Sequence, residues 1–125
     1  MNKNKNNKAI WNTRIKKKSS RLFLKVGSSI DIDKRLYKED IAASVAHVEM
    51  LFKKKIISFK IKNKIIYGLL KIEKEISKKK FEFNKKYEDI HMNIEKRLFQ
   101  IIGEEAGYVH TARSRNDQVI TDFKI

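Results

Sequence analysis

The chain has 125 residues, no cysteine, no proline and a formal net charge of +15 at pH 7. This length suits one domain, and the lack of cysteine excludes a disulfide framework or a thiolate metal site. No apolar stretch approaches the roughly 20 residues that span a bilayer, so the sequence predicts a protein of the cytoplasm.

The positive charge is concentrated near the start of the chain. Residues 1–30 hold nine basic residues and no acidic one. A dense basic surface binds nucleic acid by releasing counterions from the phosphates, so a small basic helical nucleic-acid-binding module is one interpretation. Lysines outnumber arginines by 24 to 6, however, and arginine is the residue that reads base edges and phosphate forks. The lysine excess therefore favours compositional drift over a selected binding face.

Three amphipathic helices follow an irregular arm. Residues 1–30 show no sustained hydrophobic period, whereas from Tyr37 apolar residues recur every three or four positions in three successive segments. The three stripes are Ile41, Val45, Val48 and Phe52; Ile61, Ile65, Leu69, Ile72 and Ile76; and Ile90, Ile94, Leu98 and Ile101 or Ile102. Ser58 is placed to cap the second helix and Gly103 to end the third. Strand signals are limited to residues 81–83, too short for a sheet, so the predicted fold class is all-α.

A fourth helix is predicted at the end of the sequence. Ser114, followed three residues later by Asp117, has the layout of a capping box, and Val119, Ile120 and Phe123 come behind it. This helix is only beginning at the last residue, so its apolar stripe is left without partners. We therefore expect the chain to be truncated at the start of a longer helix.

The polar run from Thr111 to Asp117 is the first candidate for chemistry. The N-terminus of a helix presents unpaired backbone N–H groups and the positive end of the helix dipole, which favour carboxylate or phosphate. Arg113 or Arg115 can add a guanidinium fork, and Asn116 can donate and accept. The alternative is a plain capped helix with solvated arginines, and the spacing alone leaves both open.

The three histidines are the next candidates. His47 lies beside the core stripe of the first helix and is predicted to be structural, while His91 suits either a core or helix-start role or a functional one. His110 immediately precedes the polar run. Because no His-x-x-x-His pair exists and the histidines are far apart in sequence, the pattern disfavours a metal site. The pair Glu88-Asp89 is typical of a helix cap rather than of acid-base chemistry.

Four separated blocks resemble argininosuccinate lyases in order and spacing. They are residues 29–41, 81–83, 88–98 and the run His110-Thr-Ala-Arg-Ser-Arg-Asn-Asp-Gln-Val119. Trp11 and Arg14 occupy the slots of the family's Trp-Gly-Gly-Arg-Phe entry motif, which makes the basic arm family sequence. The family belongs to the aspartase and fumarase superfamily, mostly helical homotetramers that eliminate fumarate from succinyl compounds. The resemblance implies an arm at 1–30, the N-terminal helical lyase domain at 31–112 and the start of a central-bundle helix at 113–125.

The resemblance also implies a substrate site for argininosuccinate, which the family cleaves into arginine and fumarate in arginine biosynthesis. Its residues would be Ser29, Asp33, His91, Ser114, Arg115 and Asn116. In the family mechanism a base removes a proton beside a carboxylate, and Arg115 with the helix end would stabilise the charge that develops. Neither a metal nor an organic cofactor is implied.

The family's catalytic base and its later histidine are expected beyond Ile125, so no catalytic residue is expected in this chain. Each active site in the superfamily is built from three subunits, and the isolated chain is therefore expected to be inactive. Ala112 replaces the glycine usual in the last block, at a cost of about 1 kcal/mol if that position needs a positive φ. A lyase for another succinyl compound is a further alternative, but the Ser-Arg-Asn-Asp form is more typical of the argininosuccinate branch.

Overall fold

The computed structural model describes residue 22 and residues 28–125. Trp11, Arg14 and nearly all of the predicted arm lie outside this part of the chain. The longer helices are α3 (Tyr37–Lys53), α4 (Phe59–Ser77), α5 (Ile90–Ile102) and α6 (Arg115–Lys124). A short helix α2 (Ile30–Asp33) and two 3₁₀ helices, η2 (Lys34–Leu36) and η3 (Gly103–His110), complete the elements. No strand occurs among the described residues, which confirms the all-α class.

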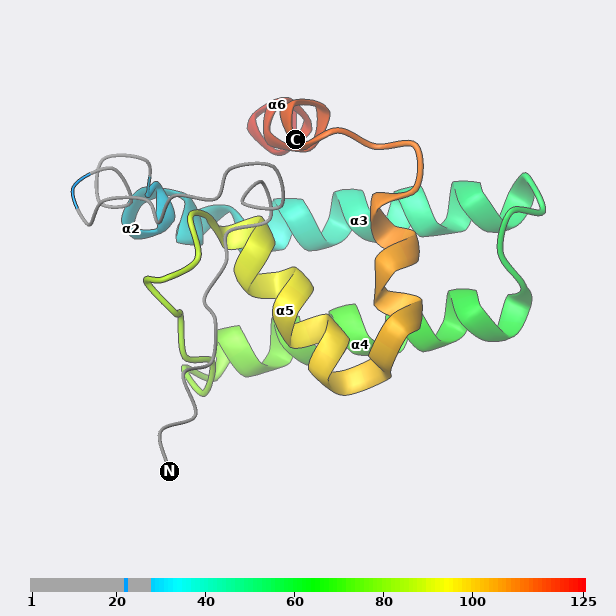
Figure 1. Cartoon of the computed structure of the whole chain (residues 1–125), viewed down its shortest axis with the longest axis horizontal. Helices are drawn as coiled ribbons and strands as arrows, with labels where there is room; N and C mark the ends of the chain where they lie inside the picture. The colour runs from blue at the N-terminus through cyan, green and yellow to red at the C-terminus, as the bar shows by residue number, and fades with distance from the viewer. Residues whose placement is uncertain (1–21, 23–27) are drawn as a thin grey trace.

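The helices are arranged around a pair of neighbours. α3 and α4 run side by side in opposite directions, and α5 crosses α4 (Figure 1). η3 then returns from the level of α4 toward α3, and α6 packs on the far side of α3, where Figure 1 shows it nearly end-on. This path brings the start of α6 close to the start of α5. No helix of the described part is long and apolar enough to cross a membrane.

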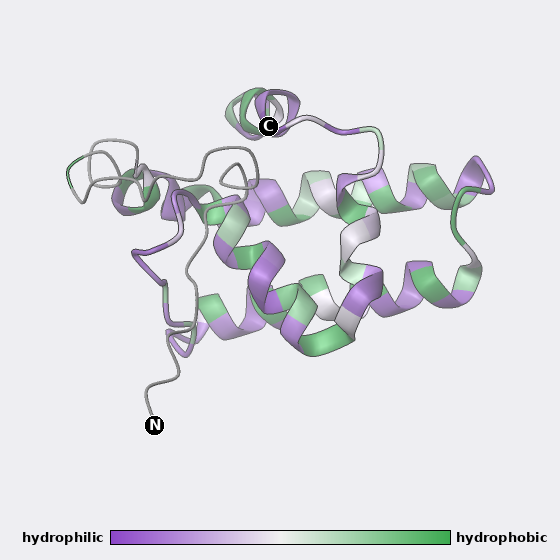
Figure 2. Cartoon of the chain, in the orientation of Figure 1, coloured by the Kyte–Doolittle hydropathy of each residue, from purple (hydrophilic) through white to green (hydrophobic). Residues whose placement is uncertain are grey.

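Local signals set the ends of these helices. Ser58 accepts a hydrogen bond from the backbone N–H of Ile61 at 3.3 Å, and Gly103 ends α5 with a φ of 81°. Both predicted caps are confirmed. Hydrophobic and hydrophilic residues alternate along each helix, as the amphipathic pattern requires (Figure 2).

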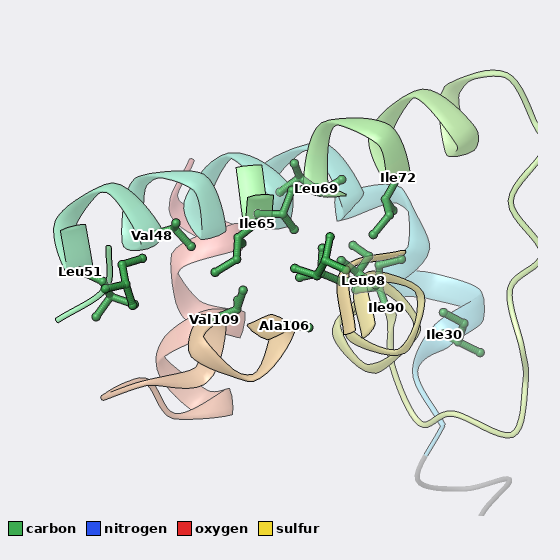
Figure 3. Packing of buried hydrophobic residues seen from close by; sticks show 14 residues of the cluster. Ile30, Val48, Leu51, Ile65, Leu69, Ile72, Ile90, Leu98, Ala106 and Val109 are labelled. Atoms are coloured by element: carbon green, nitrogen blue, oxygen red, sulfur yellow. The ribbon is translucent and has the colours of Figure 1, made fainter. Parts of the chain in front are cut away.

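The core lies where α3, α4, α5 and η3 meet, and its side chains point toward one another (Figure 3). The predicted stripes supply most of its residues. Their buried members are Ile41, Val48, Ile65, Leu69, Ile72, Ile90, Ile94, Leu98 and Ile102, and the remaining members are partly buried. Each fully buried leucine or isoleucine stabilises the fold by about 1.5–3 kcal/mol relative to an exposed one. The core therefore fixes α5, on which the polar residues of the candidate site depend.

Gly68 sets the spacing of α4 and α5. A Cβ built on this glycine would overlap the Leu98 side chain of α5 and lie 3.1 Å from the Cγ2 of Ile102. Glycine in mid-helix costs about 1 kcal/mol relative to alanine, so close packing is the physical reason for its presence here.

Gly68→Ala is expected to lower the free energy of unfolding by about 1–3 kcal/mol, because the added methyl group has to displace the Leu98 side chain. Gly107→Ala is the matched control, since nothing lies within 4 Å of a Cβ at that position. Urea denaturation of both variants gives the comparison. Equal stability of the two variants would contradict the close approach of α4 and α5.

Candidate functional site

The start of α5 gathers two of the predicted site residues. The backbone N–H of Ser29 donates to the carbonyl of Glu88 at 2.8 Å, and the Ser29 hydroxyl donates to Asp33 at 2.5 Å. The other carboxylate oxygen of Asp33 accepts from the backbone N–H of Ile90 at 3.2 Å. Asp89 caps the same helix with its side chain, as its position in the sequence predicted. Two carboxylates therefore sit at the positive end of α5.

The start of α6 holds three more predicted site residues. Ser114 and Asp117 form the predicted capping box: the Ser114 hydroxyl accepts from the backbone N–H of Asp117 at 3.1 Å, and the Asp117 carboxylate accepts from the backbone N–H of Ser114 at 3.3 Å. Arg115 is the first residue of the helix, and Asn116 beside it is exposed. The capping box thereby fixes the direction in which Arg115 leaves the helix.

Arg115 connects the two helix starts. Its Nη1 donates to Gln118 Oε1 at 3.0 Å, its Nε lies 3.5 Å from Asp89 Oδ2, and its Nη2 lies 3.7 Å from Glu95 Oε2. The two distances to carboxylates exceed the about 3.2 Å of a good N–H···O hydrogen bond. The guanidinium is thus attracted by two acids without being firmly bonded to either.

Glu95 is held as an anion on the same side. His110 Nε2 lies 2.9 Å from Glu95 Oε2. This contact with His110 lowers the pKa of the Glu95 carboxyl, burial raises it, and the charge of Arg115 adds a smaller lowering. His110, which sequence analysis left without a role, is therefore a partner of the acid that faces Arg115.

His91 lies in a buried polar cluster, which we define as Asp40, Ser44, His91, Gln118 and Asp122, all 3% exposed or less. His91 Nδ1 is 2.9 Å from Asp40 Oδ1 and 3.6 Å from Asp122 Oδ2. Gln118 Nε2 also donates to Asp40 Oδ1. The cluster joins α3, α5 and α6 directly behind the start of α5.

The buried polar cluster shifts two protonation equilibria. Burial lowers the pKa of His91, but the hydrogen bond and charge of Asp40, with a smaller contribution from Asp89, raise it by more, so the net shift is upward. Burial, and then the charge of Asp40, raise the pKa of Asp122 to about 7, and the charges of His91 and Arg113 oppose this only in part. Both groups therefore hold protons more tightly in the folded chain than in the unfolded one.

Asp40, His91 and Asp122 also have the spacing of a small metal site, because one ligand atom from each lies within 4.8 Å of the others. Their hydrogen bonds argue against this use. Asp40 Oδ1 already accepts from both His91 and Gln118, and a metal ligand would need a bare lone pair on the same His91 nitrogen. Arg113, whose Nη1 donates to Ser44 Oγ at 3.0 Å, adds a positive charge that a cation would have to face.

Sequence analysis missed Asp40, Gln118 and Asp122. The sequence carried a signal for two of these residues, since Gln118 and Asp122 are four positions apart and so share one face of a helix. The structure buries both side chains and exposes Ile120 and Phe123, two of the three apolar residues behind the capping box. His47 makes a structural contact, as expected, because its Nε2 lies 2.8 Å from the carbonyl of Thr111.

Ala112, the departure noted in the last block, has a φ of 55°. A residue with a Cβ pays about 1 kcal/mol or more in this left-handed region, and glycine does not. The condition stated from sequence is therefore met. The strain falls between the contact of Thr111 with α3 and the cap of α6 at Ser114.

The described residues form an all-α fold in which two acids and Arg115 converge where α5 and α6 begin. The model of a family described as lyase matches residues 13–125, and the chain belongs to this lyase family. It is 82% identical, over all 125 residues, to the argininosuccinate lyase of Pelagibacter ubique (strain HTCC1062), 27% of whose length the match covers.

Two other relatives give the same picture. The argininosuccinate lyase of Ehrlichia canis (strain Jake) is 51% identical over 116 residues, which is 93% of this chain and 25% of the relative. That of Chelativorans sp. (strain BNC1) is 46% identical over 125 residues, all of this chain and 26% of the relative. The chain thus spans about a quarter of the length of the curated relatives it matches. Two of the three matches include residues 1–30, so the basic segment is family sequence.

Ala112→Gly is expected to raise the free energy of unfolding by about 1 kcal/mol, because glycine adopts the positive φ without strain. Ala42→Gly is the control: the same chemical change on the exposed face of α3 should lower stability by about as much. Urea denaturation followed by circular dichroism measures both. A loss of stability in both variants would show that position 112 carries no strain.

The unfolding free energy is expected to fall as pH rises from about 5 to about 8. Because His91 has a raised folded pKa, its stabilisation is complete below its unfolded pKa and is lost as pH rises through the folded one. The raised pKa of Asp122 acts in the same direction up to about 7. Asp122→Asn should flatten this slope, measured by urea denaturation at several pH values. A stability that rises over this window in the unaltered chain would contradict both assignments.

Proposed function

We propose that this chain is the N-terminal, substrate-binding part of an argininosuccinate lyase, which cleaves argininosuccinate into arginine and fumarate. The observation that carries the proposal is Arg115: it stands on the first turn of α6 and faces the start of α5, in a chain 82% identical to a lyase of this name. Anions are favoured at such helix starts by the backbone N–H groups and by the helix dipole. Argininosuccinate carries several carboxylates and suits this chemistry.

Arg115 would act on the charge that forms during elimination. A base removes the proton from the carbon beside a carboxylate, and the electron pair spreads into that carboxylate. The C–N bond to the guanidino group then breaks as the C=C bond of fumarate forms, and the leaving nitrogen keeps the C–N electron pair and takes up a proton to give arginine. Because its contacts with Asp89 and Glu95 are 3.5 and 3.7 Å, the guanidinium is free to form shorter bonds to a carboxylate of the substrate. Its role is electrostatic and needs no proton transfer.

The other proposed ligands complement this arginine. Ser114 uses its hydroxyl oxygen as the acceptor of the cap, which leaves its O–H as a donor for the substrate. Asn116 is exposed beside it and offers an amide. Ser29, Asp33 and His91 are proposed to complete the site from the side of α5. The catalytic base is proposed to come from another part of the longer enzyme.

The whole enzyme would be a homotetramer of the cytoplasm, in which three subunits contribute to each active site. These features come from the family resemblance and stay predictions. They explain why a chain that spans about a quarter of its relatives is expected to be inactive alone.

The proposal is tested in a hybrid enzyme in which this chain replaces the matching residues of the Pelagibacter ubique relative. The hybrid should form fumarate from argininosuccinate, measured by the ultraviolet absorbance of fumarate. Arg115→Lys in the hybrid should lower kcat/KM by about 10- to 100-fold, because lysine keeps the charge but loses the planar fork.

Arg97→Lys is the matched control for this hybrid. Arg97, near the middle of α5, makes a forked ion pair with Glu75 of α4, both bonds being 2.8 Å. Its loss should lower stability and leave kcat/KM close to that of the parent. Equal losses of kcat/KM in the two variants would mean that Arg115 has no specific role, and an inactive parent hybrid would overturn the proposed function.

A further inference from the structure

His91 faces two carboxylates with a single ring nitrogen. Nδ1 lies 2.9 Å from Asp40 Oδ1 and 3.6 Å from Asp122 Oδ2, and all three residues are buried. A nitrogen that faces carboxylate oxygens has to carry the hydrogen, because two acceptors would repel each other. The charge of the ring therefore depends on the second nitrogen, Nε2, which accepts a hydrogen bond in the neutral ring and donates one in the imidazolium.

Asp122 decides between these two forms. Both of its oxygens are buried and find no hydrogen-bond partner within the described part of the chain, whereas Asp40 is bonded to Gln118 as well as to His91. A buried carboxylate without donors costs several kcal/mol unless a positive charge compensates it. Among the described residues, the ring of His91 is the group within ion-pair distance of Asp122 that can supply this charge.

The surrounding charges leave room for such an imidazolium. Acidic groups face the cluster from α3, from the start of α5 and from α6, and the positive side chains come from the segment before α6 and from the first residue of α6. The acidic groups are Glu39, Asp40, Asp89 and Asp122, and the basic groups are Arg113 and Arg115. Glu95 and His110 lie beside a small cavity that His91 also lines. The carboxylates outnumber the guanidinium groups, so a positive His91 lowers the unbalanced charge.

We propose that Asp122 is a positioning residue for the substrate site: with Asp40 it holds His91 as an imidazolium, whose Nε2–H is a charged donor for a carboxylate. This rests on the proposed function, in which His91 is a substrate ligand. His91 lines a cavity of about 10 Å³ together with Glu95, His110 and Gln118, and Arg115 contacts Glu95 and Gln118. Glu95 and Gln118 therefore lie beside both His91 and Arg115.

The two carboxylates act in different pH ranges. At acidic pH, where Asp122 is itself protonated, Asp40 is the carboxylate that stabilises the protonated ring of His91. Since burial and then Asp40 raise the pKa of Asp122 to about 7, Asp122 becomes an anion in the range where a histidine ordinarily loses its charge. Its charge then keeps the imidazolium in place at higher pH.

Nuclear magnetic resonance of ¹⁵N-labelled histidine side chains in the full chain tests the proposal. At pH 7 both ring nitrogens of His91 should carry protons in the unaltered chain. Asp122→Asn should lower the His91 titration midpoint by about one pH unit, a tenfold loss of proton affinity, and give the tautomer protonated at Nδ1. Asp31→Asn, which removes an exposed carboxylate elsewhere on α2, is the control and should leave the midpoint unchanged.

A neutral His91 at pH 7 in the unaltered chain would overturn the proposal, and this measurement does not depend on whether any variant folds. An unchanged His91 midpoint in Asp122→Asn would also overturn it. Zinc is added as a further probe: a shift of Nδ1 to the position of a metal-bound nitrogen would show that the cluster is a metal site instead. Retention of the Nδ1–H signal with zinc present would support the imidazolium.

The hybrid enzyme separates this inference from the proposed function. Asp122→Asn should raise KM for argininosuccinate more than it lowers kcat, and should move the alkaline fall of kcat/KM to lower pH by about the shift of the His91 midpoint. An unchanged pH profile would overturn the positioning role. An inactive parent hybrid would overturn the proposed function and with it the substrate role of Asp122, while the titration still decides the charge of His91.

Discussion

The buried carboxylate of Asp40 is the point at which three helices of this chain are joined. It comes from α3, accepts from His91 of α5 and accepts from Gln118 of α6. A carboxylate with 1% exposure costs several kcal/mol unless its oxygens find donors. The position of α6 and the orientation of His91 therefore follow from one requirement, which is that the buried Asp40 carboxylate must receive hydrogen bonds.

Polar contacts, more than apolar burial, hold α6 in place. Its buried residues are Gln118 and Asp122, while Ile120 and Phe123 are more than half exposed. The segment that leads to α6 is fixed in the same way, because His47 contacts the carbonyl of Thr111 and Arg113 donates to Ser44. As a result, Arg115 is directed to the start of α5 by hydrogen bonds at both ends of its short connection.

Local patterns in the sequence predicted the helices, but they could not predict the hydrogen bonds between polar residues that are far apart along the chain. The three apolar stripes and the caps at Ser58, Gly103 and Ser114 follow from helical period and from backbone groups within a few residues. The partners of Asp40 are 51 and 78 residues away along the chain. No periodicity connects such positions. The sequence could therefore predict His91 as a site residue, but it could not predict that Asp40 and Asp122 contact its ring.

The composition of the buried polar cluster indicates function more than stability. Replacing buried charges with well-packed apolar residues often leaves a fold equally stable or more stable. Asp122, moreover, has no hydrogen-bond partner among residues 28–125. Strongly shifted protonation equilibria of this kind gather where chemistry or binding needs a fixed charge. The cluster lies directly behind the helix starts near Arg115 and Asp33. Burying its charges therefore costs free energy at the place where a fixed positive charge on His91 would stabilise a bound anion.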